Sequence, residues 1–165
     1  MASQVIILDH DRWRKGAGGA QAGLSGESDS SSYSGLDLNL AQFSSSTFSG
    51  SSFTAVTFKK AQWSSCRFSN CTFSSCDFEG IGITDCTFVG CTFSASQFSD
   101  AQFSSSAFRQ CTWTSLGFDN SLWSQVDVLD CHGREITASN LRGRRVNFTG
   151  SHFEELRFNN AIINS

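Results

Sequence analysis

Aromatic residues recur at a step of five along this sequence, and this spacing constrains the fold more than any other feature. All 21 aromatic residues, comprising 16 Phe, four Trp and one Tyr, fall on one phase of a five-residue period. Between Leu38 and Val128 this phase is unbroken over 19 positions. An α-helix is excluded because a step of five does not return to one face at 3.6 residues per turn, and a flat sheet needs a period of two. Only a chain that coils repeatedly in one sense keeps every fifth side chain inside.

Small residues occupy a second phase, two positions before the aromatic one, and all seven cysteines lie on it. Residues i and i−2 of an extended segment point to the same side. Each unit is therefore expected to be a short strand with one large and one small side chain inside, followed by a corner rich in Ser, Asn, Asp and Gly. The predicted core comprises Phe43, Phe48, Phe53, Phe58, Trp63, Phe68, Phe73, Phe78, Phe88, Phe93, Phe98, Phe103, Phe108, Trp113, Phe118, Trp123, Phe148, Phe153, Phe158, Cys71, Cys91, Cys111 and Cys131.

Pairs of residues 20 apart indicate how many units close one turn. Cysteine pairs are more frequent at a separation of 20 than at 15 or 25, and opposite charges match at 20 in Lys59 with Glu79 and Arg134 with Glu154. Stacked strands lie about 4.8 Å apart, so such residues would be direct neighbours in a coil of four units.

Units such as Ser-Asn-Cys-Thr-Phe, Ser-Asp-Ala-Gln-Phe and Phe-Thr-Gly-Ser-His-Phe resemble the pentapeptide-repeat family. The resemblance covers residues 33–165. It implies an all-β fold, a right-handed quadrilateral parallel β-helix with four units per coil and about six to seven coils.

Two segments precede these repeats. We expect residues 1–15 to be a tail with a short strand at 4–8, and residues 16–32 to be a flexible Gly/Ser-rich linker. The apolar run Val5, Ile6, Ile7 and Leu8 either caps the open first coil or binds a partner, and capping is favoured because an open coil is a sheet edge. The C-terminal end lacks an evident cap, so a homodimer through the last coil is a further hypothesis.

Large and small residues exchange places between positions 131 and 146. Gly133, Ala138 and Gly143 occupy the large phase, whereas Ile136 and Val146 occupy the small one. This exchange predicts an irregular, bulged coil with Trp113 stacked against Gly133.

The chemistry of the side chains gives no sign of catalysis, a cofactor or a metal site. The cysteines are expected to be buried free thiols, because parallel stacked side chains suit neither a disulfide nor convergent metal ligands. His132 and His152 should be neighbours on an outer face, but two imidazoles without a third ligand do not make a structural zinc site. No nucleophile has a convincing base beside it.

These features favour a non-catalytic scaffold for protein–protein interaction, in the cytoplasm, with a partner that the sequence does not identify. The outward apolar residues Val89, Leu122 and Leu129 are candidate contacts, and Arg142, Arg144 and Arg145 form a candidate basic patch. No signal peptide or membrane span is evident.

The resemblance also implies an alternative, a DNA mimic that binds DNA gyrase, as quinolone-resistance proteins of the family do. Residues 33–165 have 11 acidic and 9 basic residues, a net charge of −2, whereas duplex DNA of the same length would carry about 18 negative charges. Residues 77–130 alone have a net charge of −6, from seven acids and Arg109. A secreted bacterial effector or secretion component is the remaining alternative, and nucleic acid binding is disfavoured.

Overall fold

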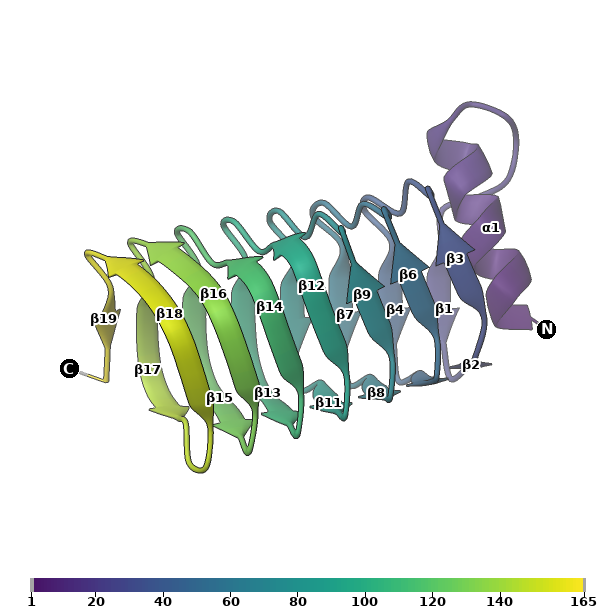
Figure 1. Ribbon diagram of the computed structural model, residues 1–165. Coiled ribbons are helices and arrows are strands. Elements are labelled where there is room, and N and C mark those ends of the chain that lie inside the picture. Colours follow the sequence, from purple (N-terminus) through teal and green to yellow (C-terminus); the bar gives the residue numbers. More distant parts are fainter. Residues whose placement is uncertain (1, 165) are drawn as a thin grey trace.

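Strands pair in parallel with the strand one coil away in the computed structural model, which describes residues 2–164 (Figure 1). Tyr33 pairs with Phe53 and Phe53 with Phe73, so one coil takes 20 residues. One sheet has seven strands, and each coil contributes one of them. The parallel β-solenoid of about seven coils that the spacing predicts is therefore confirmed.

The coil has four sides, three of which carry the paired strands. The first side consists of β1 (Gly23–Ser25), β4 (Gln42–Ser44), β7 (Gln62–Ser64), β10 (Gly82–Thr84), β13 (Gln102–Arg109), β15 (Leu122–Leu129), β17 (Arg142–Asn147) and β19 (Ile162–Ile163). The second side begins with β2 (Ser28–Asp29), β5 (Thr47–Ser49), β8 (Arg67–Ser69) and β11 (Thr87–Val89), and continues in the later halves of β13 and β15. The third side consists of β3 (Ser32–Ser34), β6 (Ser52–Thr54), β9 (Thr72–Ser74), β12 (Thr92–Gln97), β14 (Thr112–Gly117), β16 (His132–Ser139) and β18 (His152–Asn159). The fourth side begins with the isolated bridges that join Asp37, Thr57, Asp77 and Gln97.

Left-handed backbone conformations form the corners of the coil. Residues at every fifth position have positive φ, including Asn70 (φ 54°), Asp100 (φ 57°) and Gly50 (φ 69°). Asn, Asp and Gly tolerate this conformation better than other residues, which explains why they recur at this position in the sequence.

The aromatic rings stack along the axis and meet edge to face around it. Phe78 and Phe98, one coil apart, have ring centroids 4.4 Å apart and nearly parallel planes. Within one coil, Phe58 meets Trp63 edge to face at 5.1 Å. Offset stacked and edge-to-face pairs are the arrangements that aromatic quadrupoles favour.

The core narrows in exposure towards its middle and opens at its C-terminal end. The predicted core aromatic residues from Phe43 to Trp123 and the four predicted core cysteines are all buried. Phe148 and Phe153 are half-buried and Phe158 is 40% exposed. The prediction that these three belong to the closed core was therefore wrong, because no coil follows to cover them.

The N-terminal segment forms a helix, α1 (Ala2–Arg14), and the predicted strand at residues 4–8 is wrong. The side chains that it buries are Ser3, Ile7, His10 and Asp11, a spacing of three to four that is typical of a helix. Arg12 and Arg14 in the last turn complement the helix dipole. The apolar run misled the sequence interpretation because only Ile7 of it is fully buried. No helix of the described residues is long and apolar enough to cross a membrane.

Hydrogen bonds dock α1 across the open N-terminal end of the solenoid (Figure 1). The buried ring of His10 accepts a hydrogen bond at Nδ1 from the Ala22 amide (2.8 Å), so its Nε2 carries the hydrogen and donates to the Asn39 carbonyl (2.6 Å). Asp11 accepts a hydrogen bond from the Asp37 amide at 2.7 Å. The helix therefore satisfies backbone groups that an open coil would leave exposed.

Residues 22–32 build the first coil, so the predicted flexible linker over residues 16–32 is wrong for this part. Leu24 pairs with Phe43 and Asp29 with Phe48, a separation of 19 that places the first two inward positions one residue out of phase. Asp29 fills a large inward position, where it accepts hydrogen bonds from the hydroxyls of Ser3, Tyr33 and Ser51. A buried carboxylate requires such donors, and its polar identity concealed the repeat.

The coil with exchanged sizes is regular, and the predicted bulge is wrong. Trp113 pairs with Gly133, as expected, and Gly133 pairs with Phe153 without an inserted residue. A Cβ atom on Gly133 would lie 2.6 Å from the ring of Phe153. The rings of Trp113 and Phe153, two coils apart, therefore approach to 5.5 Å across the missing side chain.

Candidate interaction surface

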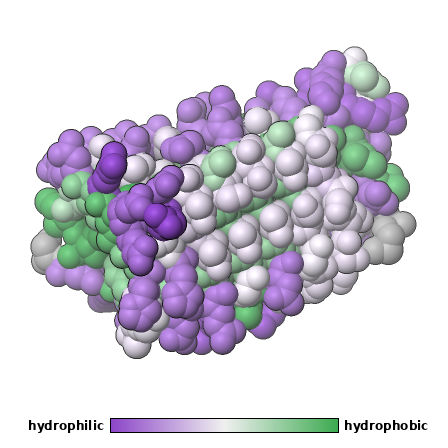
Figure 2. All heavy atoms as spheres, in the orientation of Figure 1, coloured by the Kyte–Doolittle hydropathy of each residue, from purple (hydrophilic) through white to green (hydrophobic). Residues whose placement is uncertain are grey.

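The C-terminal end of the solenoid is an apolar surface, which Figure 2 shows as a cluster of hydrophobic residues. Leu156, Phe158 and Ile162 are 47%, 40% and 43% exposed. Beside them lies an apolar cavity of about 140 Å³. Its lining residues are Trp113, Trp123, Ile136, Phe148, Phe153, Leu156, Phe158 and Ile163. We call these eight residues and Ile162 the apolar end.

Glycines determine the depth of this cavity. Gly133 and Gly143 stand where other coils carry large inward side chains, so the two tryptophans below them remain accessible to the last coil. Trp113 and Trp123 meet edge to face at 6.4 Å. Their indole N–H groups are buried and have no hydrogen-bond partner, which adds a desolvation cost to an end that is already open.

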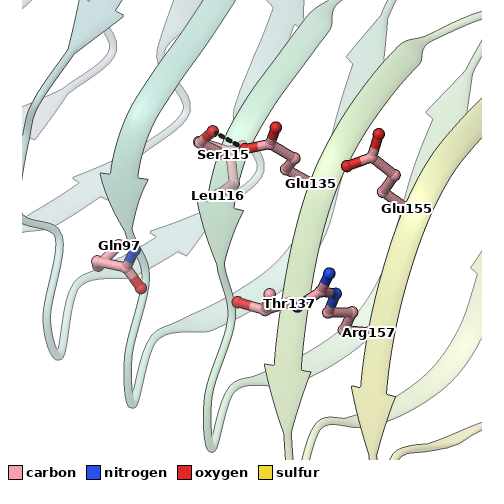
Figure 3. A pocket seen from close by; sticks show the side chains of 7 residues that line it. All are labelled: Gln97, Ser115, Leu116, Glu135, Thr137, Glu155 and Arg157. Atoms are coloured by element: carbon pink, nitrogen blue, oxygen red, sulfur yellow. Dashed lines mark hydrogen bonds between the residues drawn. The ribbon is translucent and has the colours of Figure 1, made fainter.

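A polar groove of about 360 Å³ lies on the fourth side, near the same end (Figure 3). Its lining residues are Gln97, Ser115, Leu116, Glu135, Thr137, Glu155 and Arg157. The Gln97 side chain lies over Gly117, and Ser115 donates a hydrogen bond to Glu135 at 2.8 Å. Glu155 pairs with Arg134 at 2.5 Å. The carboxylates of the groove thus already have partners, and no nucleophile–base pair is formed among these seven residues.

The predicted charge pairs at a separation of 20 are replaced by diagonal ones. Lys59 contacts Asp77 at 3.6 Å and Arg134 contacts Glu155. The expected pairs with Glu79 and Glu154 are not among the salt bridges of the described residues, because a corner side chain reaches more easily to a column beside its own. Exposed pairs of this kind contribute little to stability.

The two histidines lie side by side, as their separation predicts. The rings of His132 and His152 are exposed, nearly parallel and 5.9 Å apart. Among residues 2–164, no three His, Cys, Asp or Glu side chains come together as a metal-binding group.

The cysteines are buried free thiols throughout the described residues. Each lies at an inward small position, and Cys76 donates a hydrogen bond to the Phe53 carbonyl at 3.3 Å. Burial raises the pKa of Cys76 to about 11, so this thiol is a poor nucleophile at neutral pH.

The structure distributes the other candidate contact residues over separate surfaces. Leu122 is 50% exposed on the first side, and Val89 and Leu129 are half-buried on the second side. On α1, Val5 and Leu8 are exposed and Ile6 is half-buried, whereas Ile7 is buried against the first coil and is therefore not available to a partner.

The basic residues are also divided. Arg142 donates hydrogen bonds to the carbonyls of Leu141 and Asn160, which ties it to the last coil. Arg144 and Arg145 are exposed beside Ser124 and Gln125. Sequence reasoning missed Leu156 and Ile162, although their position within ten residues of the chain end, on inward and flanking positions, could have indicated exposure.

Comparison with known proteins agrees with the fold. Residues 61–137 match the family described as the pentapeptide repeat region. With the seven coils and the five-residue period, this match shows that the chain belongs to the pentapeptide-repeat protein family. A search of curated protein sequences gives no match.

Several solved structures are similar to this chain at low sequence identity. They include QnrB1, a plasmid-mediated fluoroquinolone resistance protein (16% identity, 85% of this chain and 92% of that chain, TM-score 0.40). They also include the pentapeptide-repeat protein Rfr23 from the cyanobacterium Cyanothece 51142 (8%, 87% and 90%, 0.37). A third is HetL from Nostoc sp. strain PCC 7120, a protein involved in heterocyst differentiation regulation (10%, 95% and 95%, 0.25).

Proposed function

We propose that this pentapeptide-repeat protein is a non-catalytic scaffold for protein–protein interaction, and that its apolar end binds a second copy of the chain. The observation that supports this proposal most directly is the exposure of Leu156, Phe158 and Ile162 on a coil that has no following coil. The N-terminal end of the same solenoid is covered by α1. Contiguous exposed apolar surface beside an open sheet edge is typical of an interface.

A second copy is the partner whose chemistry fits this end best. The apolar end is open along the solenoid axis, so two copies related by a two-fold axis would bury both ends at once and leave no open edge. The same contact would cover the cavity beside Trp113 and Trp123. The polar faces of both solenoids would stay free for other partners.

The oligomeric state tests this proposal. We expect light scattering after size exclusion to give twice the 18.0 kDa chain mass for the native protein, and the monomer mass for Phe158→Lys. Leu122→Lys is the matched control, because it introduces the same charge at an exposed apolar residue on the first side, and it should remain a dimer. A monomeric native protein at the highest soluble concentration, or a dimeric Phe158→Lys variant, would refute the proposal.

A gyrase-binding DNA mimic remains the alternative to this scaffold. Asp77, Glu79, Asp100 and Asp119 lie on the fourth side and its corner, whereas Asp85, Asp127 and Asp130 lie elsewhere on the coil. Such a distribution does not reproduce the continuous charge of a duplex. We therefore expect no inhibition in a gyrase supercoiling assay, and inhibition at micromolar protein would favour the mimic. No feature of the described residues supports a secreted effector specifically.

A further inference from the structure

The third side of the solenoid carries a regular array of hydroxyl groups. Five successive strands, β3, β6, β9, β12 and β14, each place two outward residues beside one inward aromatic ring. All ten outward residues are serine or threonine. We call them the hydroxyl face: Ser32, Ser34, Ser52, Thr54, Thr72, Ser74, Thr92, Ser94, Thr112 and Thr114.

The array carries no charge over its whole length. The corner residues that border it are also uncharged, from Gly35 to Ser115 on one edge and from Ser30 to Gln110 on the other. In Figure 2 the hydroxyl face is a broad, pale surface of neutral hydropathy with side chains in rows. Charge begins one coil later, at Arg134.

The core holds this face flat and in register. Phe53, Phe73 and Phe93 stack with ring centroids 5.3 Å and 4.8 Å apart and planes within 10° of parallel. The backbone register is 20 residues at each of the four steps from β3 to β14. Because strands, rings and register all repeat, the hydroxyl groups form a two-dimensional lattice whose positions do not drift.

The dimensions of this lattice follow from β geometry. Neighbouring coils are about 4.8 Å apart, and alternate residues of one strand are about 6.6 Å apart. The prism plane of hexagonal ice repeats in two perpendicular directions by a pair of distances close to these. An uncharged hydroxyl donates and accepts hydrogen bonds as a water molecule does, so it can replace water in such a plane without placing a charge in the crystal.

No other side of the solenoid has this regularity. At the position that corresponds to Thr72, the second side carries Thr47, Arg67, Thr87, Ala107 and Asp127 in successive coils. The first side carries Gln42, Gln62, Gly82, Gln102 and Leu122. Long or charged side chains of several sizes cannot match a plane with one repeat.

We propose that the hydroxyl face binds the surface of an ice crystal. Its charge neutrality and its two repeats match an uncharged water lattice. Ten hydroxyl groups held rigidly in one plane contribute together, since little conformational freedom remains to be lost on binding. A bound protein would force the ice front to grow with curvature between adsorbed molecules, which lowers the temperature at which the crystal grows.

Partition into slowly growing ice tests the proposal directly. We expect the native protein to be enriched in the ice fraction and to shape single crystals in a nanolitre osmometer. Thr92→Tyr places a bulky ring at the centre of the hydroxyl face and should reduce incorporation several-fold. Thr47→Tyr makes the same change at an exposed threonine of β5 on the second side, and it should be incorporated like the native protein.

Equal melting temperatures of the two variants would show that folding is not the cause of a difference. The proposal is overturned if the native protein is rejected from ice like an unrelated soluble protein, or if Thr92→Tyr is incorporated as well as Thr47→Tyr. Binding to crystalline cellulose or chitin without enrichment in ice would equally overturn it. Phe158→Lys should retain ice binding as a monomer, so failure of the dimer proposal and failure of this one are separate results.

Discussion

Replacing Phe93 by alanine tests the stacked core at its centre. Phe93 is 1% exposed and lies parallel to Phe73 at 4.8 Å. It also meets Phe88 edge to face at 5.6 Å and Phe108 at 5.9 Å. The substitution removes the ring and all of these contacts while leaving the backbone ladder intact.

The expected loss can be estimated from the packing. Truncation of a buried Phe to Ala costs about 3–5 kcal/mol, and the cost rises when the cavity cannot collapse. The rings above and below Phe93 are fixed by parallel strands at one register, so little relaxation is available. Aromatic pairs add about 0.5–1.5 kcal/mol each beyond burial. We therefore expect a loss of about 4–5 kcal/mol in the free energy of unfolding.

Urea unfolding followed by circular dichroism and tryptophan fluorescence measures this loss, with the slope m checked for a change in the unfolding reaction. The matched control is Ser94→Ala, the next residue on the same strand, which points outward and should change stability by no more than about 0.5 kcal/mol. If both variants lost the same stability, the assignment of inward and outward positions would be wrong.

Three further predictions concern other parts of the coil. Gly133→Ala should destabilise the protein by about 1–3 kcal/mol, because its Cβ would contact the Phe153 ring, whereas Gly23→Ala, whose Cβ meets nothing within 4 Å, should be nearly neutral in a thermal melt. Desolvation lowers the pKa of His10 below its ordinary 6.5; His10 is therefore neutral when docked and gains a proton when released, so the stability present above about pH 6.5 should decrease as the pH falls, and melting temperatures across about pH 5–8 should lose this dependence in His10→Gln. A thiol reagent should react with all seven cysteines only after unfolding without reductant, and fewer than seven reactive thiols would indicate a disulfide.

The fold could be predicted from the sequence because its determinant is local and repeated. The inward position of each unit is set by strand alternation, and each Phe reports on the same environment. Four units per turn followed from the excess of pairs at a separation of 20, as the register of Phe53 with Phe73 shows.

The ends of the solenoid were harder to predict because their determinants are not periodic. Asp29 takes the place of an aromatic residue and depends on donors from Ser3, Tyr33 and Ser51, which are distant in sequence. The helix α1 has a weak apolar stripe, since two of its four buried residues that face the coil are His10 and Asp11. Tertiary hydrogen bonds, rather than hydrophobic spacing, determine its conformation.

The candidate surfaces depended on a similar distinction. Gly133 was recognised as exceptional, but its effect could not be read from spacing alone, because the outcome depends on how far the Phe153 ring reaches towards Trp113. The exposure of Leu156 likewise depends on the absence of a covering coil, which is a property of the whole arrangement.

The constant register between coils makes the length of this molecule adjustable in fixed steps. A tandem duplication of residues 92–111 would supply one complete turn whose two edges match those of its neighbours, because Thr92 pairs with both Thr72 and Thr112. The separation between the helix at one terminus and the apolar residues at the other would then grow by about 4.8 Å, with the orientation of every side preserved. A gain or loss of a single residue would instead rotate all later rings out of the interior.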